Sequence, residues 1–428
     1  MFTFLYHFIW ALIFIFCAPI VLLIRNKRLL ERLALNLPPG SIGGDNIWIH
    51  ALSVGEVISA LPLVEALGKK YPDKGIVFSV ATVRGMAVVR EKLEGKVKAI
   101  ITMPVDSLLC IRRIVSYIRP YVFILVETDI WPALLIYLKK KDIKVILVNG
   151  RISPRTFKSY SRAPFFVRRM FEPLELCLMQ SDLDRERLLQ IGIDPPRKII
   201  TVGNIKFDRD WTPMDEKEKE GWLNRLGLDS KETVWVAGST HPGEEKILFD
   251  VYKRLHQSFP SLRFIIAPRR IEQSDDILKL AHNMGLRATL KSEFSTNEGR
   301  PYDVLVLNTL GELGRVYGLG KISFVGGSLV PFGGHNLLEP ASFGCPVVFG
   351  CHTHNFVLMS ESLLETGGGW QVHDGEELYK AMSTLLGDIE IQNSMGSLAK
   401  EFVDKNRGAL DRVVSYIAKS MDGAGGFH

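Results

Sequence analysis

The sequence predicts an α/β protein with two doubly wound domains, and three observations support this fold class. From residue 47 onward, short apolar runs alternate with longer amphipathic stretches. Strands that are apolar throughout, with helices between them, are typical of parallel sheets covered on both faces. The chain has 428 residues, enough for two domains of ordinary size. A charged stretch within residues 207–231 separates two series of such runs and predicts a linker.

Apolar runs bounded by turn residues are predicted as strands. Seven precede the linker, at residues 47–51, 75–81, 99–103, 122–126, 144–148, 176–179 and 199–202, and five follow it, at 233–237, 263–267, 304–307, 322–325 and 346–349. The predicted organisation is residues 1–30 as a membrane anchor, 31–208 as the first domain, 209–230 as the linker and 231–428 as the second domain. Ligands of doubly wound sheets bind beyond the carboxyl ends of the strands, so polar residues there are site candidates.

The amino-terminal segment, residues 2–24, contains no Asp, Glu, Lys or Arg and is long enough to cross a bilayer as a helix. Arg25, Lys27 and Arg28 follow it at once, which places the rest of the chain on the cytoplasmic face by the positive-inside rule. A cleaved signal peptide is the alternative, although a basic segment before the apolar run is missing. An anchor that only embeds in one leaflet is a second alternative, since His7 and Pro19 interrupt the run.

The composition is that of a folded protein, with 46% hydrophobic and 23% charged residues, so disorder is not expected. A net charge of +6 favours anionic partners. The five cysteines have neither zinc-ligand spacing nor the pattern of a disulfide framework. His352 and His354 lack a suitably spaced carboxylate, so no metal site is predicted.

A glycine-rich stretch at residues 323–350 is the strongest candidate for a ligand site. It predicts a strand, a loop with paired glycines, a helix opening near His335 and Asn336, and a further strand. Glycines allow close approach of the backbone to a ligand, and a helix start offers unpaired N–H groups to a phosphate. Asn336 and Glu339, one turn apart, could reach a phosphate and a sugar hydroxyl. An ordinary strand–loop–helix turn with a polar cap is the alternative.

Acidic residues follow several predicted strands in the first half. Ser53 and Glu56 have the spacing of a capping box, yet Glu56 would also lie at the mouth of a cleft, where a carboxylate can accept a proton. Asp106 has no obvious capping role. Glu127 also follows a strand, whereas Asp129 could cap a helix with Pro132 in its first turn.

Residues 150–172 are basic and rich in aromatic residues, with no acid before Glu172. Such a segment suits nucleic acid or a phosphorylated lipid at a membrane, and a solvated basic face is the third interpretation. The apolar segment at the amino terminus favours lipid. The predicted acceptor-binding residues are Ser53, Gly55, Arg151, Arg155, Lys158 and Arg162.

Strand ends in the second half carry groups suited to a phosphate. Thr240 is predicted to cap a helix, and Arg269 places a guanidinium at the next strand end. Thr309 and Glu312 have capping-box spacing. Ser239, Thr240, Ser328 and Gly334 are therefore taken as donor-binding candidates.

The motifs together resemble bacterial 3-deoxy-D-manno-octulosonic acid (Kdo) transferases along almost the whole chain. They are IWIHALSVGE at 47–56, ETDIWP at 127–132, VNGRIS at 148–153, Ser159 and Tyr160, GNIKFD at 203–208, and the stretches 238–245, 268–269, 311–313 and 326–341. The resemblance implies two facing Rossmann-like domains of the GT-B type and an inverting transfer without a metal or other cofactor.

The resemblance also implies residue roles. Glu56 matches the general base, and Asp106 and Lys206 match positions that help to stabilise the transition state. The positions that match contacts to the CMP part of the donor are Pro268, Arg269, Gly311, Glu312, Leu313, Asn336, Leu337, Leu338 and Glu339.

The implied reaction moves Kdo from CMP-Kdo to the lipid A precursor lipid IVA, at the inner membrane, in lipopolysaccharide inner-core synthesis. The implied partners are CMP-Kdo, lipid IVA and inner-membrane lipids, with no nucleic acid. A sugar-nucleotide epimerase, another membrane-associated GT-B enzyme, and a non-catalytic nucleotide-binding membrane protein are the alternatives, because a fold does not fix a function.

Overall fold

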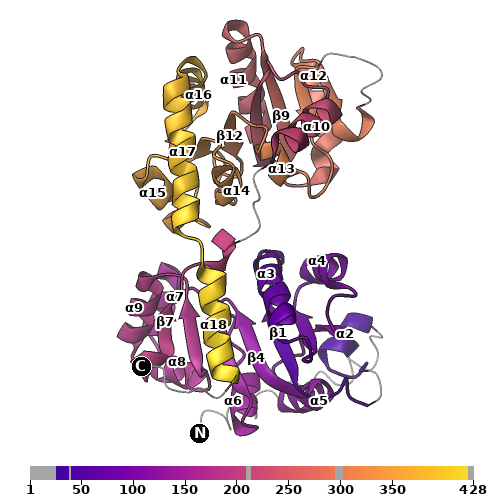
Figure 1. Cartoon of the computed structure of the whole chain (residues 1–428), viewed down its shortest axis with the longest axis vertical. Coiled ribbons are helices and arrows are strands. Elements are labelled where there is room, and N and C mark those ends of the chain that lie inside the picture. Colours follow the sequence, from indigo (N-terminus) through magenta and orange to yellow (C-terminus); the bar gives the residue numbers. More distant parts are fainter. Residues whose placement is uncertain (1–25, 38–39, 209–213, 295–301, 423–428) are drawn as a thin grey trace. The chain divides into compact units, whose positions relative to one another are not determined.

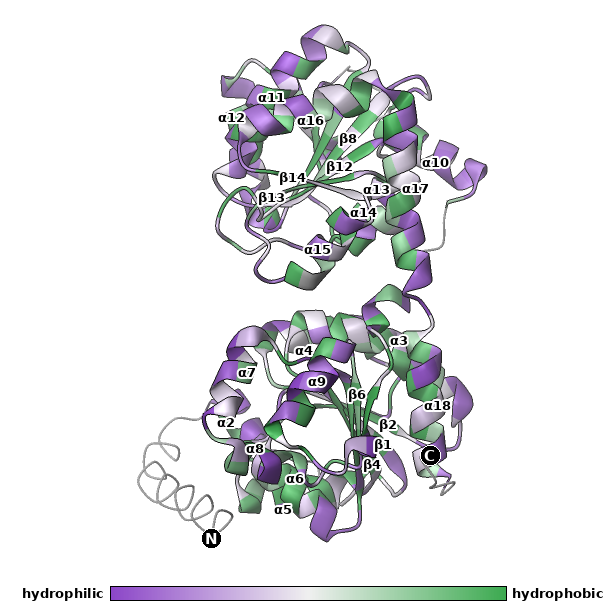
Figure 2. Ribbon diagram, turned by 90° about the vertical axis from the view of Figure 1, so that its left-hand side faces the viewer, coloured by the Kyte–Doolittle hydropathy of each residue, from purple (hydrophilic) through white to green (hydrophobic). Residues whose placement is uncertain are grey.

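The computed structural model describes residues 26–37, 40–208, 214–294 and 302–422. The chain forms two compact units. Unit 1 comprises Met1–Asp210 together with Arg407–His428, and unit 2 comprises Trp211–Asn406. Each unit is built around one parallel sheet, whose apolar strands are green in Figure 2.

Unit 1 contains a seven-stranded sheet in the order β3-β2-β1-β4-β5-β6-β7, in which every neighbouring pair is parallel. The chain moves outward from β1 to β3 and then returns to β4, so β1 and β4 flank the topological switch point, where such folds bind ligands. The strands are β1 Asn46–Ala51, β2 Ile76–Val80, β3 Ala99–Thr102, β4 Pro120–Val126, β5 Lys144–Gly150, β6 Leu176–Met179 and β7 Ile199–Thr201.

Helices cover both faces of this sheet, because alternate residues of each strand point to opposite faces. Ile47 and Ile49 of β1 pack with α3, α4 and α18, whereas Trp48 packs with α5, α6, α8 and α9. The helices of unit 1 are α2 Lys27–Arg32, α3 Val54–Lys70, α4 Val83–Leu93, α5 Leu108–Ile118, α6 Pro132–Lys140, α7 Pro154–Ser161, α8 Pro164–Phe171, α9 Asp182–Ile191 and α18 Ala409–Met421, with short 3₁₀ turns η1 Pro196–Lys198 and η2 Ile205–Asp208.

Unit 2 repeats this plan with a parallel seven-stranded sheet in the order β10-β11-β9-β8-β12-β13-β14. Its switch point lies between β8 and β12. The strands are β8 Thr233–Thr240, β9 Leu262–Pro268, β10 Ala288–Leu290, β11 Val304–Val306, β12 Ile322–Val325, β13 Val347–Gly350 and β14 Gly369–Val372.

The faces of the second sheet are covered in the same way. Trp235 and Ala237 of β8 pack with α11, α12 and α16, while Val234 and Val236 pack with α10 and α13. The helices of unit 2 are α10 Glu216–Leu226, α11 Glu244–Ser258, α12 Ser274–Asn283, α13 Leu313–Tyr317, α14 Leu338–Ser342, α15 Val357–Glu365, α16 Gly375–Gly387 and α17 Ile389–Lys405, with η3 Ile271–Gln273 and η4 Lys291–Glu293.

All twelve predicted strands are present, with ends shifted by three residues at most. The fold class predicted from the sequence is confirmed. The prediction missed β10 and β14, which are the two edge strands of the second sheet. Both are short and mostly half-exposed, so they lack the continuous apolar run that marks a central strand.

The carboxyl-terminal boundary of the second predicted domain is wrong, because α18 belongs to unit 1. Its buried face carries Ala409, Val413, Ile417 and Met421, which pack in the same core as α3. The Asp208 carboxylate accepts hydrogen bonds from the N–H groups of Gly408 and Leu410 and so fixes the start of the helix. Figure 1 shows α18, in yellow, beside α3.

Among the residues that the structure describes, no helix has the length and apolar character needed to cross a membrane. The predicted anchor is at residues 1–30, and residues 1–25 lie outside the described part. The last residues of the predicted anchor, 27–30, form the start of α2, which is capped by the Asn26 side chain.

Candidate active site

Glu56 lies in the first turn of α3, directly after β1 at the switch point of unit 1. One of the two bonds of the predicted capping box is present, since Oγ of the N-cap residue Ser53 accepts a bond from the Glu56 N–H at 3.4 Å. The Glu56 carboxylate accepts bonds from the Leu52 N–H at 2.6 Å and from Ser53 Oγ–H at 3.0 Å. Gly55, in the same turn, is exposed and leaves the surface around Ser53 open.

The Glu56 carboxyl has a pKa raised to about 7, first because burial disfavours its charge and second because Glu127 is negatively charged. Near neutral pH the group therefore exchanges a proton readily, which is the property of a general base. A capping role and a catalytic role are compatible, because each carboxylate oxygen has a second lone pair.

Glu127 and Lys206 form an ion pair at the same switch point, with Lys206 Nζ at 2.8 Å from Glu127 Oε1. Glu127 follows β4 and has a φ of 59°, a left-handed backbone conformation that is uncommon outside glycine. Such strained positions concentrate at functional sites. The pair joins residues 79 positions apart, so spacing alone could not have revealed it.

Asp129 and His50 lie beside this cluster. The Asp129 carboxylate accepts a bond from Trp131 Nε1–H at 2.7 Å and lies 3.6 Å from Nε2 of the buried His50. Its charge also raises the pKa of Glu56. The interpretation of Asp129 as a cap for α6 is wrong, because its side chain is not bonded to the start of that helix.

Asp106 makes the capping bonds of α6 instead. Its carboxylate is buried, and its two oxygens accept bonds from the N–H groups of Ala133 and Leu134, both at 2.9 Å. The statement that Asp106 lacks a capping role is therefore wrong. The sequence could not show the cap, because the capped helix begins 26 residues downstream.

Replacing Asp106 with alanine is expected to destabilise unit 1 by about 1–3 kcal/mol, because two buried N–H groups lose charged acceptors. Thermal unfolding of the purified variant measures this loss. If Asp106 acts mainly as a cap, kcat measured well below the unfolding temperature stays within about threefold of the wild type, whereas a stable variant with a far lower kcat would show direct participation in the reaction.

The predicted acceptor-binding arginines and lysine of unit 1 lie on the segment that follows β5. Arg155, Lys158 and Arg162 are exposed along α7 and the turn after it, and Arg151 directly follows β5. In the described parts of the chain, Arg155, Lys158 and Arg162 form no ion pair, so their charges face solvent. Phe165 and Phe166 are exposed at the start of the adjacent α8.

The donor candidates of unit 2 gather at the carboxyl edge of its sheet. Ser239 and Thr240 end β8, Pro268 ends β9 beside Thr240, and Ser328 follows β12. Arg269 is exposed, and its guanidinium makes no hydrogen bond or ion pair with any described residue. It is therefore free to bind a phosphate beside the switch point. Gly311, Glu312 and Leu313 follow β11, the neighbour of β9.

The side chains of several predicted donor contacts are buried or are already bonded to other parts of the protein. Ser328 Oγ–H donates to the Val325 carbonyl and accepts from the Gly350 N–H. Leu337 and Leu338 are core residues. The Glu312 carboxylate is bonded to Lys291 and to the Thr309 hydroxyl. The predicted capping box is not formed, because Glu312 is itself the N-cap residue of α13 and makes no side-chain cap bond. Ser328, Leu337 and Leu338 could therefore contact a ligand only through backbone atoms.

The glycine-rich stretch 323–350 forms the expected strands, but two of its glycines are needed because other backbone segments pack closely against them. A Cβ on Gly326 would lie 2.6 Å from the Ser239 carbonyl oxygen, and one on Gly350 would lie 2.1 Å from that of Ser328. The expected helix begins at Leu338, two residues after Asn336, and is only five residues long. The Asn336 side chain accepts a bond from the Leu338 N–H, although the N-cap residue of this helix is Leu337, which makes no side-chain cap bond.

Two histidines at the switch point were not among the predicted site residues. Their Nε2 atoms, in His241 after β8 and His335 after β12, lie 2.8 Å apart, and Phe332 stacks on His241. Burial, and then the charge of Arg269, lower both pKa values, that of His335 to about 4. Both rings are neutral at pH 7, so one donates and the other accepts. Thr240, predicted to cap the following helix, does not, since α11 begins at Glu244.

The chain is similar to one known protein family and to individual members of it. The family model for 3-deoxy-D-manno-octulosonic-acid transferase (kdotransferase) matches residues 27–209. A 3-deoxy-D-manno-octulosonic acid transferase of Haemophilus influenzae is 31% identical over 98% of this chain and 99% of its own length. A bifunctional glycosyltransferase/methyltransferase of Fusobacterium nucleatum is 34% identical over 84% of this chain and 55% of its own.

Solved structures support the fold alone. A putative UDP-N-acetylglucosamine 2-epimerase from Listeria monocytogenes has a TM-score of 0.61 at 15% identity, covering 89% of this chain and 98% of its own. The predicted GT-B type of fold is thus confirmed. The relative from Haemophilus influenzae matches this chain from end to end, and the family model covers most of unit 1. The chain belongs to the 3-deoxy-D-manno-octulosonic acid transferase family.

Proposed function

We propose that this protein is an inverting glycosyltransferase that moves Kdo from CMP-Kdo to the lipid A precursor lipid IVA. The observation that carries the proposal is the Glu56 carboxyl, with a pKa of about 7, at the switch point of a chain in this family. Its carboxylate removes the proton from a sugar hydroxyl of the lipid. The hydroxyl oxygen then attacks the anomeric carbon of Kdo, and CMP leaves with the electrons of the broken bond.

Unit 2 binds the nucleotide in this proposal. The unpaired Arg269 guanidinium and nearby backbone N–H groups hold the phosphate of CMP, and they stabilise the charge that develops on it as CMP leaves. Lys206 contributes positive charge near the reacting hydroxyl while it also holds Glu127 in place. No metal or other cofactor is part of the proposed reaction.

The acceptor's phosphates bind to the exposed basic surface of α7, where Arg155, Lys158 and Arg162 lack ion-pair partners among the described residues. Ser53 and Gly55 line the approach to Glu56. Residues 1–30 attach the protein to the inner membrane, with both units on the cytoplasmic face.

The experiment is a transfer assay with purified full-length protein, CMP-Kdo and a tetraacylated lipid A precursor, in the presence of EDTA. Release of CMP together with a lipid product heavier by one or more Kdo residues supports the proposal and counts the transfers. CMP binding without any lipid product, with or without added Mg²⁺, would overturn lipid IVA as the acceptor. Activity that appears only with Mg²⁺ would overturn the metal-free mechanism.

The rate of transfer is expected to rise with pH and to level off above about pH 7, because Glu56 must be ionised to accept a proton. The charge of Glu127 contributes to the raised pKa of Glu56, so Glu127→Gln shifts the midpoint of the pH profile downward. Lys206→Met leaves the charge of Glu127 uncompensated and shifts the midpoint upward.

Profiles of kcat against pH, measured for the three proteins between pH 5 and 9, check these directions. The midpoint of each profile does not depend on its maximal rate, so the comparison stays valid even where a substitution lowers that rate. Midpoints that coincide in all three proteins would contradict the assignment of the titrating group to Glu56.

A further inference from the structure

The exposed face of α5 has an unusual composition for a surface helix. Its buried face packs in the core of unit 1 through Ile111, Ile114 and Ile118. The opposite face carries Leu108 and Leu109, which are 37% and 67% exposed, followed by the exposed Arg112 and Arg113. The helix contains no acidic residue, and in the described parts of unit 1 neither arginine forms an ion pair. An apolar start next to unpaired cations is typical of helices that lie in a membrane interface.

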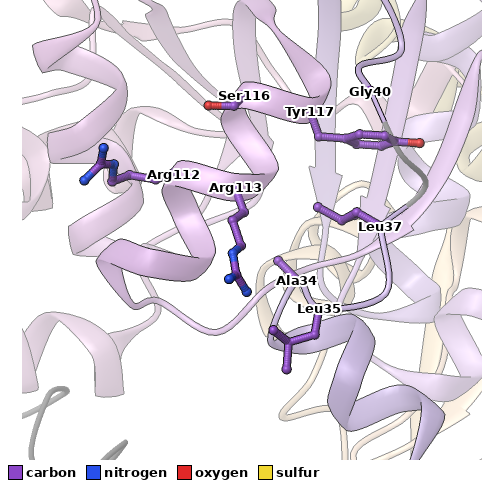
Figure 3. Close-up of a pocket in the computed structure, with 8 residues that line it drawn as sticks. All are labelled: Ala34, Leu35, Leu37, Gly40, Arg112, Arg113, Ser116 and Tyr117. Carbon is purple, nitrogen blue, oxygen red and sulfur yellow. The ribbon is translucent and has the colours of Figure 1, made fainter.

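The turn after α2 extends this surface. Leu33 and Ala34 pack against Cys110 of α5, and the Cys110 Sγ–H donates to the Leu33 carbonyl. The next residue, Leu35, is 52% exposed. An open cavity of about 600 Å³ lies between this turn and α5. Figure 3 shows its lining, with Arg113 extending from α5 toward Leu35 and Arg112 extending away from the turn.

The position of this surface along the chain indicates what covers it. The described part of unit 1 begins at Asn26, which caps α2, and α2 leads within one turn to Leu33 and Leu35. The 23 residues 2–24 that precede it are free of Asp, Glu, Lys and Arg. In the proposed function this segment attaches the chain to the bilayer, and α2, which follows it, would then lie with its neighbour α5 at the bilayer surface.

The local charge fits an anionic surface. Arg28 and Arg32 of α2 add their positive charges to those of Arg112 and Arg113. The two charges of α2 lie close together, since the pKa of Arg32 is lowered first by burial and then by the charge of Arg28. The one acid of α2, Glu31, has its carboxylate bonded to the Thr102 hydroxyl. The surface is thus positive around its exposed leucines.

We propose that the docking face, defined as Leu35 together with Leu108, Leu109, Arg112 and Arg113, lies against an anionic phospholipid bilayer. The leucine side chains enter the headgroup region, and the guanidinium groups bind lipid phosphates. The docking face shares no residue with Glu56 and its turn or with the acceptor-binding residues of α7. The inference rests on the membrane attachment in the proposed function, and not on the identity of the transferred sugar.

The experiment places an environment-sensitive fluorophore on the docking face of the full-length protein. Cys17 and Cys351 are first replaced by serine, because Cys110, Cys177 and Cys345 are buried. Leu109→Cys then carries the label. Leu183→Cys is the matched control, since Leu183 is a 40% exposed leucine on α9, next to the exposed Asp182. Both proteins are reconstituted into vesicles of equal parts phosphatidylcholine and phosphatidylglycerol that contain a lipid-borne quencher.

The label at Leu109 is expected to be quenched by the lipid and the label at Leu183 to remain in water. Arg112→Gln and Arg113→Gln should each lower the ratio of docked to undocked protein about fivefold, and vesicles of phosphatidylcholine alone should lower it further. Circular dichroism of the variants checks that α5 is still folded.

Three results would overturn the inference. The first is a Leu109 label that stays in water although the protein floats with the vesicles. The second is equal quenching of the two labels. The third is a blue shift of the Leu109 label that depends on protein concentration without vesicles, which would identify a second copy of the chain as the occupant. A protein that does not float with vesicles would also refute the proposed membrane attachment, whereas the transfer assay tests the reaction independently.

Discussion

Replacing Glu56 with glutamine is expected to lower kcat for Kdo transfer by about 10²–10⁴-fold, because the amide cannot accept the proton of the attacking hydroxyl. Glutamine has nearly the same shape and retains one oxygen as an acceptor for the Leu52 N–H or the Ser53 hydroxyl. The residual rate should also lose its dependence on pH around neutrality. Initial rates of CMP release with the lipid acceptor measure both effects.

The control is Glu65→Gln, which changes an exposed glutamate on the same helix, α3. Its kcat should equal that of the wild type. CMP affinity, measured by calorimetry, should be unchanged in both variants, because the proposed nucleotide site belongs to unit 2. A folded Glu56→Gln protein with normal turnover would refute the assignment of Glu56 as the base.

The sequence predicted those features that depend on residues close together along the chain. Central strands such as β6 and β12 were predicted with their observed ends, because both faces of each are buried and the apolar run is continuous. The bond between Ser53 and Glu56 was predicted because a helix places residues three apart on the same side. In both cases the pattern within a few residues is sufficient.

Contacts between residues far apart in the sequence were not predictable in this way. Glu127 pairs with Lys206 and His241 with His335 across 79 and 94 positions. Asp106 caps a helix that begins beyond an intervening helix and strand. These contacts arise because parallel strands bring their carboxyl ends to one edge of the sheet, and the order of the strands decides which loops meet. The roles of Asp106 and Lys206 carried over from the family are therefore best tested by mutation.

A second large effect is expected for Glu244→Ala, which should destabilise unit 2 by about 3–5 kcal/mol. The Glu244 side chain is fully buried at the start of α11. Oε2 accepts bonds from the N–H groups of His241 at 3.0 Å and Gly327 at 2.7 Å, and Oε1 accepts from Ser328 at 3.0 Å and Leu329 at 2.9 Å. Alanine leaves these four N–H groups without their acceptor.

Glu244 connects the loops after β8 and β12, which are the two loops that flank the switch point of unit 2. The cost of the substitution should therefore appear first in these loops. Hydrogen exchange followed by mass spectrometry measures it locally, as faster exchange in peptides that cover residues 238–245 and 322–330. This readout suits a chain of two units, in which one unfolding transition need not describe both. CMP affinity should fall as well, because the loops lie beside Arg269.

Glu244→Gln distinguishes the loss of acceptors from the loss of volume. The amide keeps the size of the side chain and one acceptor oxygen, but it directs an NH₂ group at two backbone N–H donors. If the hydrogen bonds stabilise the loops, Glu244→Gln should increase their hydrogen exchange about half as much as Glu244→Ala does. If packing of the side chain stabilises them, Glu244→Gln should change the exchange very little. Glu272→Ala, which changes an exposed glutamate of η3, is the control and should leave exchange unchanged. Equal exchange in the Glu244→Ala and Glu272→Ala proteins would show that the carboxylate does not hold the two loops together.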